Sequence, residues 1–146
     1  MNSPIFNLKA SKLPAISGYD VHIYFEGADG HAKANALAAA VKAAIPGVEG
    51  PFQVKAGLGP HLFANVEVAI PPEALSKVLT LLQLDNKGLS VLVHPHTGDE
   101  TLDHTKLVNW VGKPVPLNLD ALLPPSQRQN NTVKNNVAKF SAPKAA

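Results

Sequence analysis

The sequence predicts an α+β domain of the ferredoxin-like type, with a four-stranded antiparallel sheet that carries two helices on one face. Between residues 19 and 94, strand and helix patterns follow one another as strand, helix, strand, strand, helix, strand, which is the βαββαβ order of this architecture. Both helical segments are amphipathic, as helices packed on one sheet face must be. The opposite face is therefore left for a ligand, a partner subunit or the C-terminal segment.

The first strand is predicted at residues 19–25, where aromatic and β-branched residues are concentrated. Side chains alternate between the two faces of a strand, so this segment divides into two sets. One face receives Tyr19, Val21, Ile23 and Phe25, and the other receives Asp20, His22 and Tyr24. Apolar residues at helical spacing then predict a helix over residues 31–45, which ends at Pro46-Gly47.

The second half of the pattern contains three further elements of the sheet and one helix. Strands are predicted near residues 52–55, over 61–70 and over 89–94. The helix between the last two starts at Pro71-Pro72-Glu73, because proline is favoured in the first helical turn. A short helix over residues 103–111 and an extended, proline-rich segment over 113–117 are expected to follow.

The composition predicts one globular domain with two less ordered ends. Hydrophobic residues make up 45% of the 146 residues and charged residues 16%, which is typical of a folded chain. We expect a loosely packed lead-in over residues 1–17 and the ferredoxin-like domain over 18–123. From residue 124 to 146, Gln, Asn, Lys and Ala dominate, which predicts a disordered tail or one that docks on a partner.

Composition and charge also exclude several classes of function. The chain has no cysteine, so disulfides, thiolate nucleophiles and iron–sulfur clusters are excluded, and a metal must be bound by histidine or oxygen ligands. Residues 124–146 carry a charge of +4 and the rest of the chain −2, so the domain itself is a poor platform for nucleic acid. No apolar run approaches the ~20 residues of a membrane helix, and no signal sequence is recognisable. We expect a cytoplasmic protein without membrane or nucleic-acid partners.

Three of the six histidines fall at strand positions from which they can face the open side of the sheet. His22 lies in the middle of the first strand, His61 begins the third, and His94 ends the fourth. Imidazole is a common ligand of iron, zinc and copper, and a sheet is a rigid mount for it. The alternative is that each is an ordinary hydrogen-bonded residue. Their spacings match no short metal motif, and the strand order 4-1-3-2 would place His61 and His94 toward opposite ends of the sheet.

Other polar residues extend this candidate site. Glu67 shares the face of His61 and is the best-placed strand carboxylate for a facial triad, although an exposed strand glutamate is the simpler interpretation. His96, in the loop after the fourth strand, is a candidate ligand or acid–base group, or has no role. His104 follows Asp103, and a pair between the two would raise the basicity of the imidazole.

The same residues carry a resemblance to a known family. The run Ser90-Val91-Leu92-Val93-His94-Pro95-His96-Thr97-Gly98-Asp99, followed by Asp103-His104, Trp110-Val111-Gly112 and Pro116-Leu117, resembles the DOPA 4,5-dioxygenase family. His22-Ile23-Tyr24-Phe25 and Gly59-Pro60-His61 match the same pattern in the same order. The resemblance covers about residues 18–123. It implies a ferredoxin-like domain with a non-haem metal that performs extradiol cleavage of a catechol such as DOPA, with O2.

The resemblance also implies the site residues. His22, His61, His94 and His104 carry over by motif. We expect the first three to bind Fe(II), or another divalent metal in a purified sample. We assign His104 to acid–base catalysis, since histidine has an ordinary pKa of about 6.5. We also expect a homodimer. The rival interpretations are a non-enzymatic module that binds a small molecule or metal, an RNA-binding domain of the same topology, and a cofactor-free oxygenase.

Overall fold

A computed structural model of the protein describes residues 15–128, so most of the predicted lead-in and tail lies outside the described residues. Its main elements follow in this order: β1 (Tyr19–Tyr24), α1 (Gly27–Ala44), β2 (Glu49–Val54), β3 (Asn65–Ile70), α2 (Leu75–Leu84), β4 (Val91–Pro95), α3 (Glu100–Asp103) and β5 (Asn109–Val111). Short 3₁₀ helices lie at Pro72–Ala74, Leu119–Leu122 and Pro125–Gln127. Within residues 15–128, no helix combines the length and the apolar character needed to cross a membrane.

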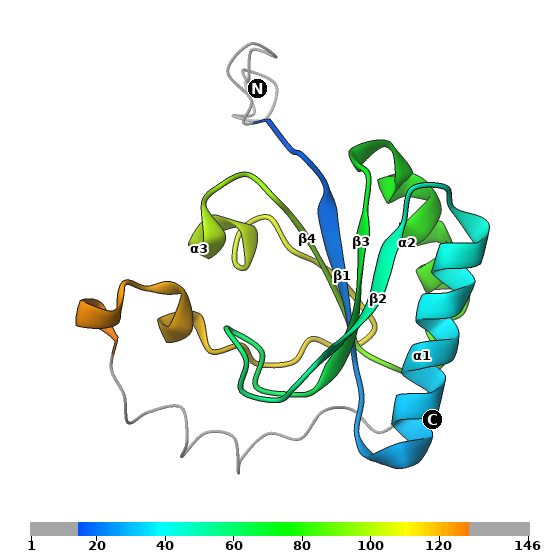
Figure 1. Cartoon of the computed structure of the whole chain (residues 1–146), viewed down its shortest axis with the longest axis horizontal. Coiled ribbons are helices and arrows are strands. Elements are labelled where there is room, and N and C mark those ends of the chain that lie inside the picture. The colour runs from blue at the N-terminus through cyan, green and yellow to red at the C-terminus, as the bar shows by residue number, and fades with distance from the viewer. Residues whose placement is uncertain (1–14, 129–146) are drawn as a thin grey trace, which may run out of the picture.

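The strands form one antiparallel sheet in the order β2-β3-β1-β4-β5. The prediction of an α+β protein with an antiparallel sheet is therefore confirmed, and the first four strands have the predicted neighbours. The predicted number of strands is wrong, because β5 adds a fifth beside β4. Figure 1 shows α1 and α2 together on one side of this sheet.

The fifth strand replaces part of the short helix predicted over residues 103–111. Only Glu100–Asp103 is helical, and Asn109–Val111 pairs with β4, with Trp110 opposite Leu92 and Val111 opposite Val91. The apolar residues here fit a helical period as well as a strand. The unpaired backbone of β4 decides the outcome, because pairing satisfies its N–H and C=O groups and suits Trp and Val.

The third strand is shorter than predicted. It begins at Asn65 rather than His61, because the pairing with β1 ends at Tyr24 and Asn65, and only one further backbone hydrogen bond, from Phe25 to Ala64, follows. Residues 61–64 instead belong to a loop, and His61 forms an isolated bridge with Leu117 from the C-terminal segment. This change moves His61 off the sheet.

The main hydrophobic core lies between the sheet and the helices α1 and α2. The alternation predicted for β1 is confirmed, because Val21 and Ile23 are fully buried in this core while Tyr24 packs in a different cluster. Residues from every layer contribute to the core, among them Leu37, Val41, Val66, Val68, Val78, Leu82, Val91 and Val93.

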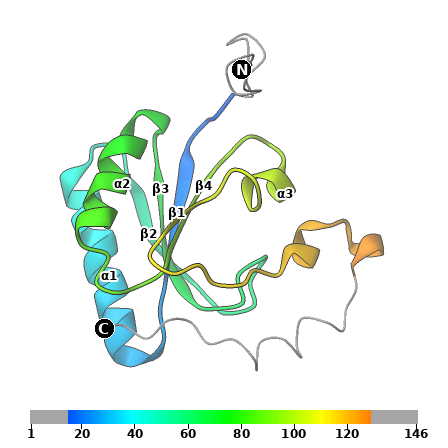
Figure 2. The same cartoon turned by 180° about the vertical axis from the view of Figure 1, so that it is seen from behind.

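A second, smaller cluster covers part of the opposite sheet face. Tyr24 and Leu92 of the sheet pack there against Leu62, Phe63 and Val115 from loops. Figure 2 shows that α3 and residues 113–128 lie on this side, away from α1 and α2. Residues 113–128 therefore occupy part of the face that the helices leave open.

Gly112, directly after β5, provides a test of how tightly the fifth strand is fixed. It has a φ of +77°, and an added Cβ would lie 2.7 Å from the carbonyl oxygen of Leu89. We expect Gly112→Ala to lower the free energy of unfolding by about 2–3 kcal/mol in urea titrations. The matched control is Gly57→Ala. Gly57 has a φ of +84°, but an added Cβ there would meet no atom of the described chain within 4 Å, so this substitution should lower the free energy of unfolding by only about 1 kcal/mol. Equal losses in the two variants would contradict this account.

Candidate metal centre

Polar side chains gather where β1 lies between its two neighbours on the open sheet face. Asp20 and His22 project from β1 to this side, at alternate positions. The register places His94 of β4 directly opposite Asp20, and Glu67 of β3 directly opposite His22. Three adjacent strands thus supply imidazoles and carboxylates to one small area.

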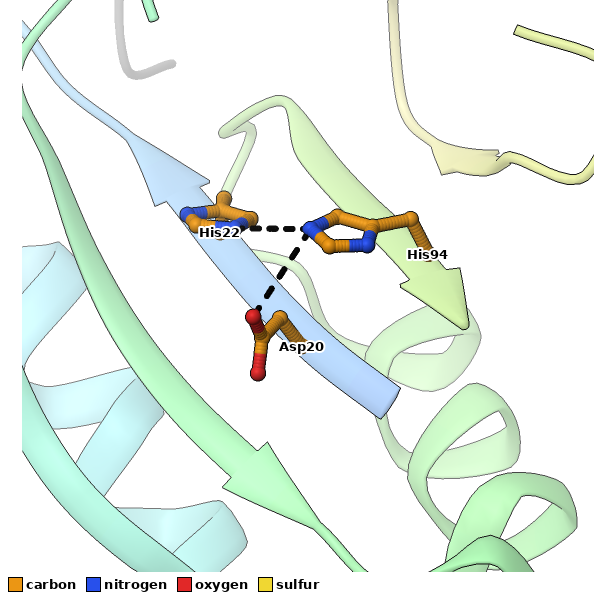
Figure 3. Close-up of side chains that lie close together, drawn as sticks. All are labelled: Asp20, His22 and His94. Carbon is orange, nitrogen blue, oxygen red and sulfur yellow. Dashed lines mark hydrogen bonds and ion pairs between the residues drawn. The ribbon is translucent and has the colours of Figure 1, made fainter. Parts of the chain in front are cut away.

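Two of the predicted ligands meet a carboxylate in this area. The Nε2 atoms of His22 and His94 lie 3.1 Å apart, and Oδ2 of Asp20 lies 3.8 Å from Nε2 of His94 (Figure 3). One donor atom from each residue lies within 4.8 Å of the other two, and residues 15–128 contain no other such group of three. His22 and His94 are 3% and 2% exposed.

Hydrogen bonds fix which nitrogen of each ring carries the proton. Nδ1 of His22 donates to the side-chain oxygen of Asn65 at 2.9 Å, and the amide nitrogen of Asn65 donates to the carbonyl oxygen of Phe63, which sets the amide orientation. Nδ1 of His94 donates to the carbonyl oxygen of Pro95 at 3.1 Å. Because a carbonyl oxygen only accepts, both neutral rings have the proton on Nδ1 and a lone pair on Nε2.

This arrangement fits a metal ion. Two lone pairs that face each other at 3.1 Å repel unless a cation lies between them. Burial lowers the pKa of His22 and of His94, and the neighbouring imidazoles lower both further, so a proton is disfavoured in that position. Nitrogen ligands of one first-row metal ion lie roughly 3 Å apart, and a Nδ1 that donates to a carbonyl is the usual outer hydrogen bond of a metal-bound histidine. Asp20, His22 and His94 can therefore hold a metal ion.

His61 faces the same site from the loop before β3. Its ring centroid is 4.0 Å from that of His22, and its Nδ1 lies 2.8 Å from the hydroxyl of Tyr24. The loop is closed by a backbone hydrogen bond from Gly57 to the carbonyl of His61. The expected separation of His61 from His94 along the sheet does not arise, because His61 lies on a loop that returns over the open face. Burial raises the pKa of the Tyr24 hydroxyl above its ordinary value.

His104 completes the set of four predicted histidines, since its ring centroid lies 4.1 Å from that of His94. The possible pair with Asp103 does not form, because the carboxylate of Asp103 accepts hydrogen bonds from the backbone and side chain of Thr97. Those bonds fold the loop after β4 back over the sheet. Nδ1 of His104 donates instead to the carbonyl oxygen of Glu100 at 2.7 Å, which leaves the lone pair on Nε2.

These side chains line a cavity of about 270 Å³. Its wall contains all four predicted histidines together with His96, three acidic residues and an apolar part formed by Val54, Leu58 and Pro60. No lysine or arginine of the described chain lines it. The cavity is therefore acidic and rich in imidazole, and it has one apolar side.

Two further residues of the cavity interact with Asp20. Nε2 of His96 lies 2.9 Å from Oδ2 of Asp20; burial acts to lower the pKa of His96, but the hydrogen bond and charge of Asp20 raise it above its ordinary value. Burial and the adjacent Asp20 raise the pKa of Glu67 to about 7. Glu67 is thus half-buried in the cavity rather than a simple exposed strand residue.

Sequence reasoning missed Asp20 as a candidate ligand. The sequence analysis placed it on the same face as His22 but considered only Glu67 as a carboxylate for the triad. The available signal was the Asp20-Val21-His22 spacing, because residues two apart on a strand project side by side. The fold and the site together define an antiparallel α+β protein with a buried, metal-competent group of two histidines and one carboxylate.

The chain belongs to the Dopa 4,5-dioxygenase family, whose model matches residues 19–121. A DOPA 4,5-dioxygenase of Amanita muscaria is 39% identical over 62 residues, which cover 42% of this chain and 27% of that protein. An uncharacterised protein of Botryotinia fuckeliana is 37% identical over 70 residues, which cover 42% of this chain and 38% of that protein. The chain thus spans less than half the length of these curated relatives.

A solved structure has the same fold. The crystal structure of a candidate dioxygenase from Nostoc punctiforme superposes with a TM-score of 0.61 at 33% sequence identity, and the match covers 73% of this chain and 91% of that one.

The buried imidazoles predict a pH dependence of stability in the metal-free protein. Burial, with the nearby His104 and His94, lowers the pKa of His61 from 6.5 to about 4. Between these values the unfolded chain binds a proton that folded His61 does not, so the free energy of unfolding falls as the pH falls through this window. Each such group contributes up to about 1.4 kcal/mol per pH unit. Urea titrations between pH 6 and pH 4.5 measure this dependence. We expect the free energy of unfolding to fall less steeply with falling pH in His61→Gln than in the wild type. Parallel curves for the two proteins would contradict the effect of burial on His61.

Proposed function

We propose that this protein is an extradiol ring-cleaving dioxygenase that acts on a catechol such as DOPA with O2 at a non-haem Fe(II). One observation carries the proposal: two unprotonated imidazole nitrogens lie 3.1 Å apart beside a carboxylate, in a cavity with further imidazoles. Two histidines and one carboxylate are the typical ligands of non-haem Fe(II) oxygenases. Membership of the Dopa 4,5-dioxygenase family and the similarity to the Amanita muscaria enzyme support the same reaction.

In this proposal Asp20, His22 and His94 hold the metal. Asp20 takes the place that the resemblance gave to His61, because its oxygen lies with the two Nε2 atoms in the one compact donor group of the described chain. Fe(II) held by these residues would supply open coordination positions for a catechol and O2, which would make their reaction effectively intramolecular. The neutral imidazoles and the single carboxylate leave the centre positively charged, which favours an anionic catecholate.

The protein's own proton acceptor in this proposal is His104. Its Nδ1–H is held by the carbonyl of Glu100, so the unprotonated Nε2 is the atom available to a ligand in the cavity that His104 lines. It can accept the proton of a catechol hydroxyl as the substrate binds and return it to the product. The short helix α3 sets this position, because Asp99 caps its N-terminus through the backbone N–H of Leu102.

The cavity also suits a single aromatic ring. At about 270 Å³ it is slightly smaller than the usual range of ligand pockets, which measure roughly 300–1,000 Å³. Val54, Leu58 and Pro60 form an apolar wall for the ring, while the imidazoles lie at the polar side where the catechol oxygens would bind.

The activity is tested by anaerobic reconstitution with Fe(II), followed by addition of DOPA and air. We expect O2 consumption and a yellow ring-opened product, and no product from the same protein loaded with Zn(II). Metal binding without O2 consumption for any catechol would instead indicate a non-enzymatic metal-binding module.

The ligand assignment predicts the metal content of variants. His22→Ala, His94→Ala and Asp20→Asn should each lower the iron bound per chain at least tenfold after the same reconstitution, because each removes one of three donors. The control is His31→Ala, which removes an imidazole that bonds Gln53 outside the cavity and should leave the iron content unchanged. Full occupancy in all three variants, measured by elemental analysis, would rule out this centre.

The role of His104 is separated from that of a ligand by measuring iron and turnover in one preparation. His104→Ala should keep its iron and still bind catechol, yet turn over about 100-fold more slowly or worse, because the proton acceptor is lost. If the variant loses its iron instead, His104 is a metal ligand and the proposed division of roles is wrong.

A further inference from the structure

We propose that Tyr24 is a positioning residue that keeps the ring proton of His61 on Nε2, so that His61 donates a hydrogen bond to an oxygen of the bound substrate rather than binding the metal. The identity of that substrate rests on the proposed function. The position of the proton on His61 does not, and it can be measured without any turnover.

The hydroxyl of Tyr24 is buried beside the ring of His61. Tyr24 is 1% exposed, and its hydroxyl lies 2.8 Å from Nδ1 of His61, the hydrogen-bond partner that the described chain offers it. A buried hydroxyl proton needs an acceptor, since an unsatisfied buried donor is costly. If Nδ1 carried the ring proton, the contact would leave the Tyr24 proton without an acceptor. The hydroxyl therefore donates to Nδ1, and neutral His61 carries its own proton on Nε2.

His61 thereby differs from the other three histidines of the cavity. The Nδ1 atoms of His22, His94 and His104 all face carbonyl oxygens, so these rings present lone pairs at Nε2. The Nδ1 of His61 alone among the four faces a hydroxyl. The group that contacts Nδ1 thus places the ring proton on Nδ1 in three of the histidines and on Nε2 in His61.

The consequence follows from the place of His61 in the cavity wall. Its two nitrogens lie on different sides of the ring, so the contact with Tyr24 leaves Nε2–H for a ligand in the cavity that His61 lines. The ring lies beside that of His22, one of the proposed metal donors, with centroids 4.0 Å apart. A fixed N–H donor at this point stabilises negative charge on a catecholate oxygen.

The tautomer is measured by long-range ¹H–¹⁵N NMR on protein labelled with ¹⁵N-histidine, in the metal-free and the Zn(II)-loaded forms. The His61 signals are assigned by their absence in His61→Gln. We expect a protonated Nε2 and an unprotonated, hydrogen-bonded Nδ1 in both forms. A protonated Nδ1, or a Nε2 shift characteristic of zinc coordination, would overturn the proposal.

Tyr24→Phe removes only the hydroxyl and should release the constraint, giving a mixture of His61 tautomers. The matched control is Trp110→Phe, which alters the ring packed against Tyr24, with centroids 6.1 Å apart, but leaves the hydrogen bond. This control should keep the wild-type His61 spectrum. An unchanged tautomer in Tyr24→Phe, or an equal change in both variants, would show that the hydroxyl does not set the proton.

The activity readout is kept separate from the spectroscopic one. With the iron content unchanged, Tyr24→Phe should lower kcat/KM about tenfold or more, in the range usual for the loss of an outer-shell partner. His61→Gln, which presents an amide N–H, should retain more activity than His61→Ala at equal iron content, and equal activity in the two would contradict the donor role. If no variant and no wild-type preparation is active, the proposed function fails, while the NMR result still decides the role of Tyr24.

Discussion

The structure depends on the central position of β1 and on the two-residue period of its side chains. β1 pairs with β3 on one side and with β4 on the other, so both of its edges are hydrogen-bonded. Val21 and Ile23 are fully buried in the core, and the intervening His22 is almost as buried on the other face. A shift of one residue in register would exchange the core with the cavity. The packing that stabilises the domain therefore also fixes the direction of the side chains that can hold a metal ion.

Two backbone carbonyls, the side-chain amide of Asn65 and the hydroxyl of Tyr24 then determine what each imidazole can do. Four histidines share one cavity, yet their chemistry differs, because the group behind Nδ1 decides where the proton is placed. These partners come from different parts of the chain: a strand amide for His22, the adjacent Pro95 for His94, and the first residue of α3 for His104. The presence of four histidines does not show which ring nitrogen of each carries the proton. The hydrogen bonds of their Nδ1 atoms do show it.

The sequence predicted those features of the site that depend on regular structure. The face of His22 and the position of His94 follow from strand alternation, which holds wherever a strand is paired on both sides. The approach of His61 could not be predicted in this way. It depends on where β3 loses its partner and on a bridge to Leu117, more than 50 residues further along the chain. β5 was missed for a related reason, since a three-residue strand is decided by the free edge of β4 and not by its own short pattern.

Some side chains of the cavity project from paired strands and others from loops or a short helix, and these two settings differ in how readily they change. The donors of the candidate centre project from paired strands, where backbone hydrogen bonds limit movement of the ligand atoms. His61 and His104 project from a loop and from the end of a four-residue helix, and the apolar wall at Leu58 and Pro60 is also a loop. Loops change in length and sequence more readily than paired strands do. Changes in those loops can therefore alter the shape of the cavity and the positions of its proton-handling groups without disturbing the metal donors. In this arrangement the loops determine the shape of the cavity, and the sheet provides the ability to hold a metal.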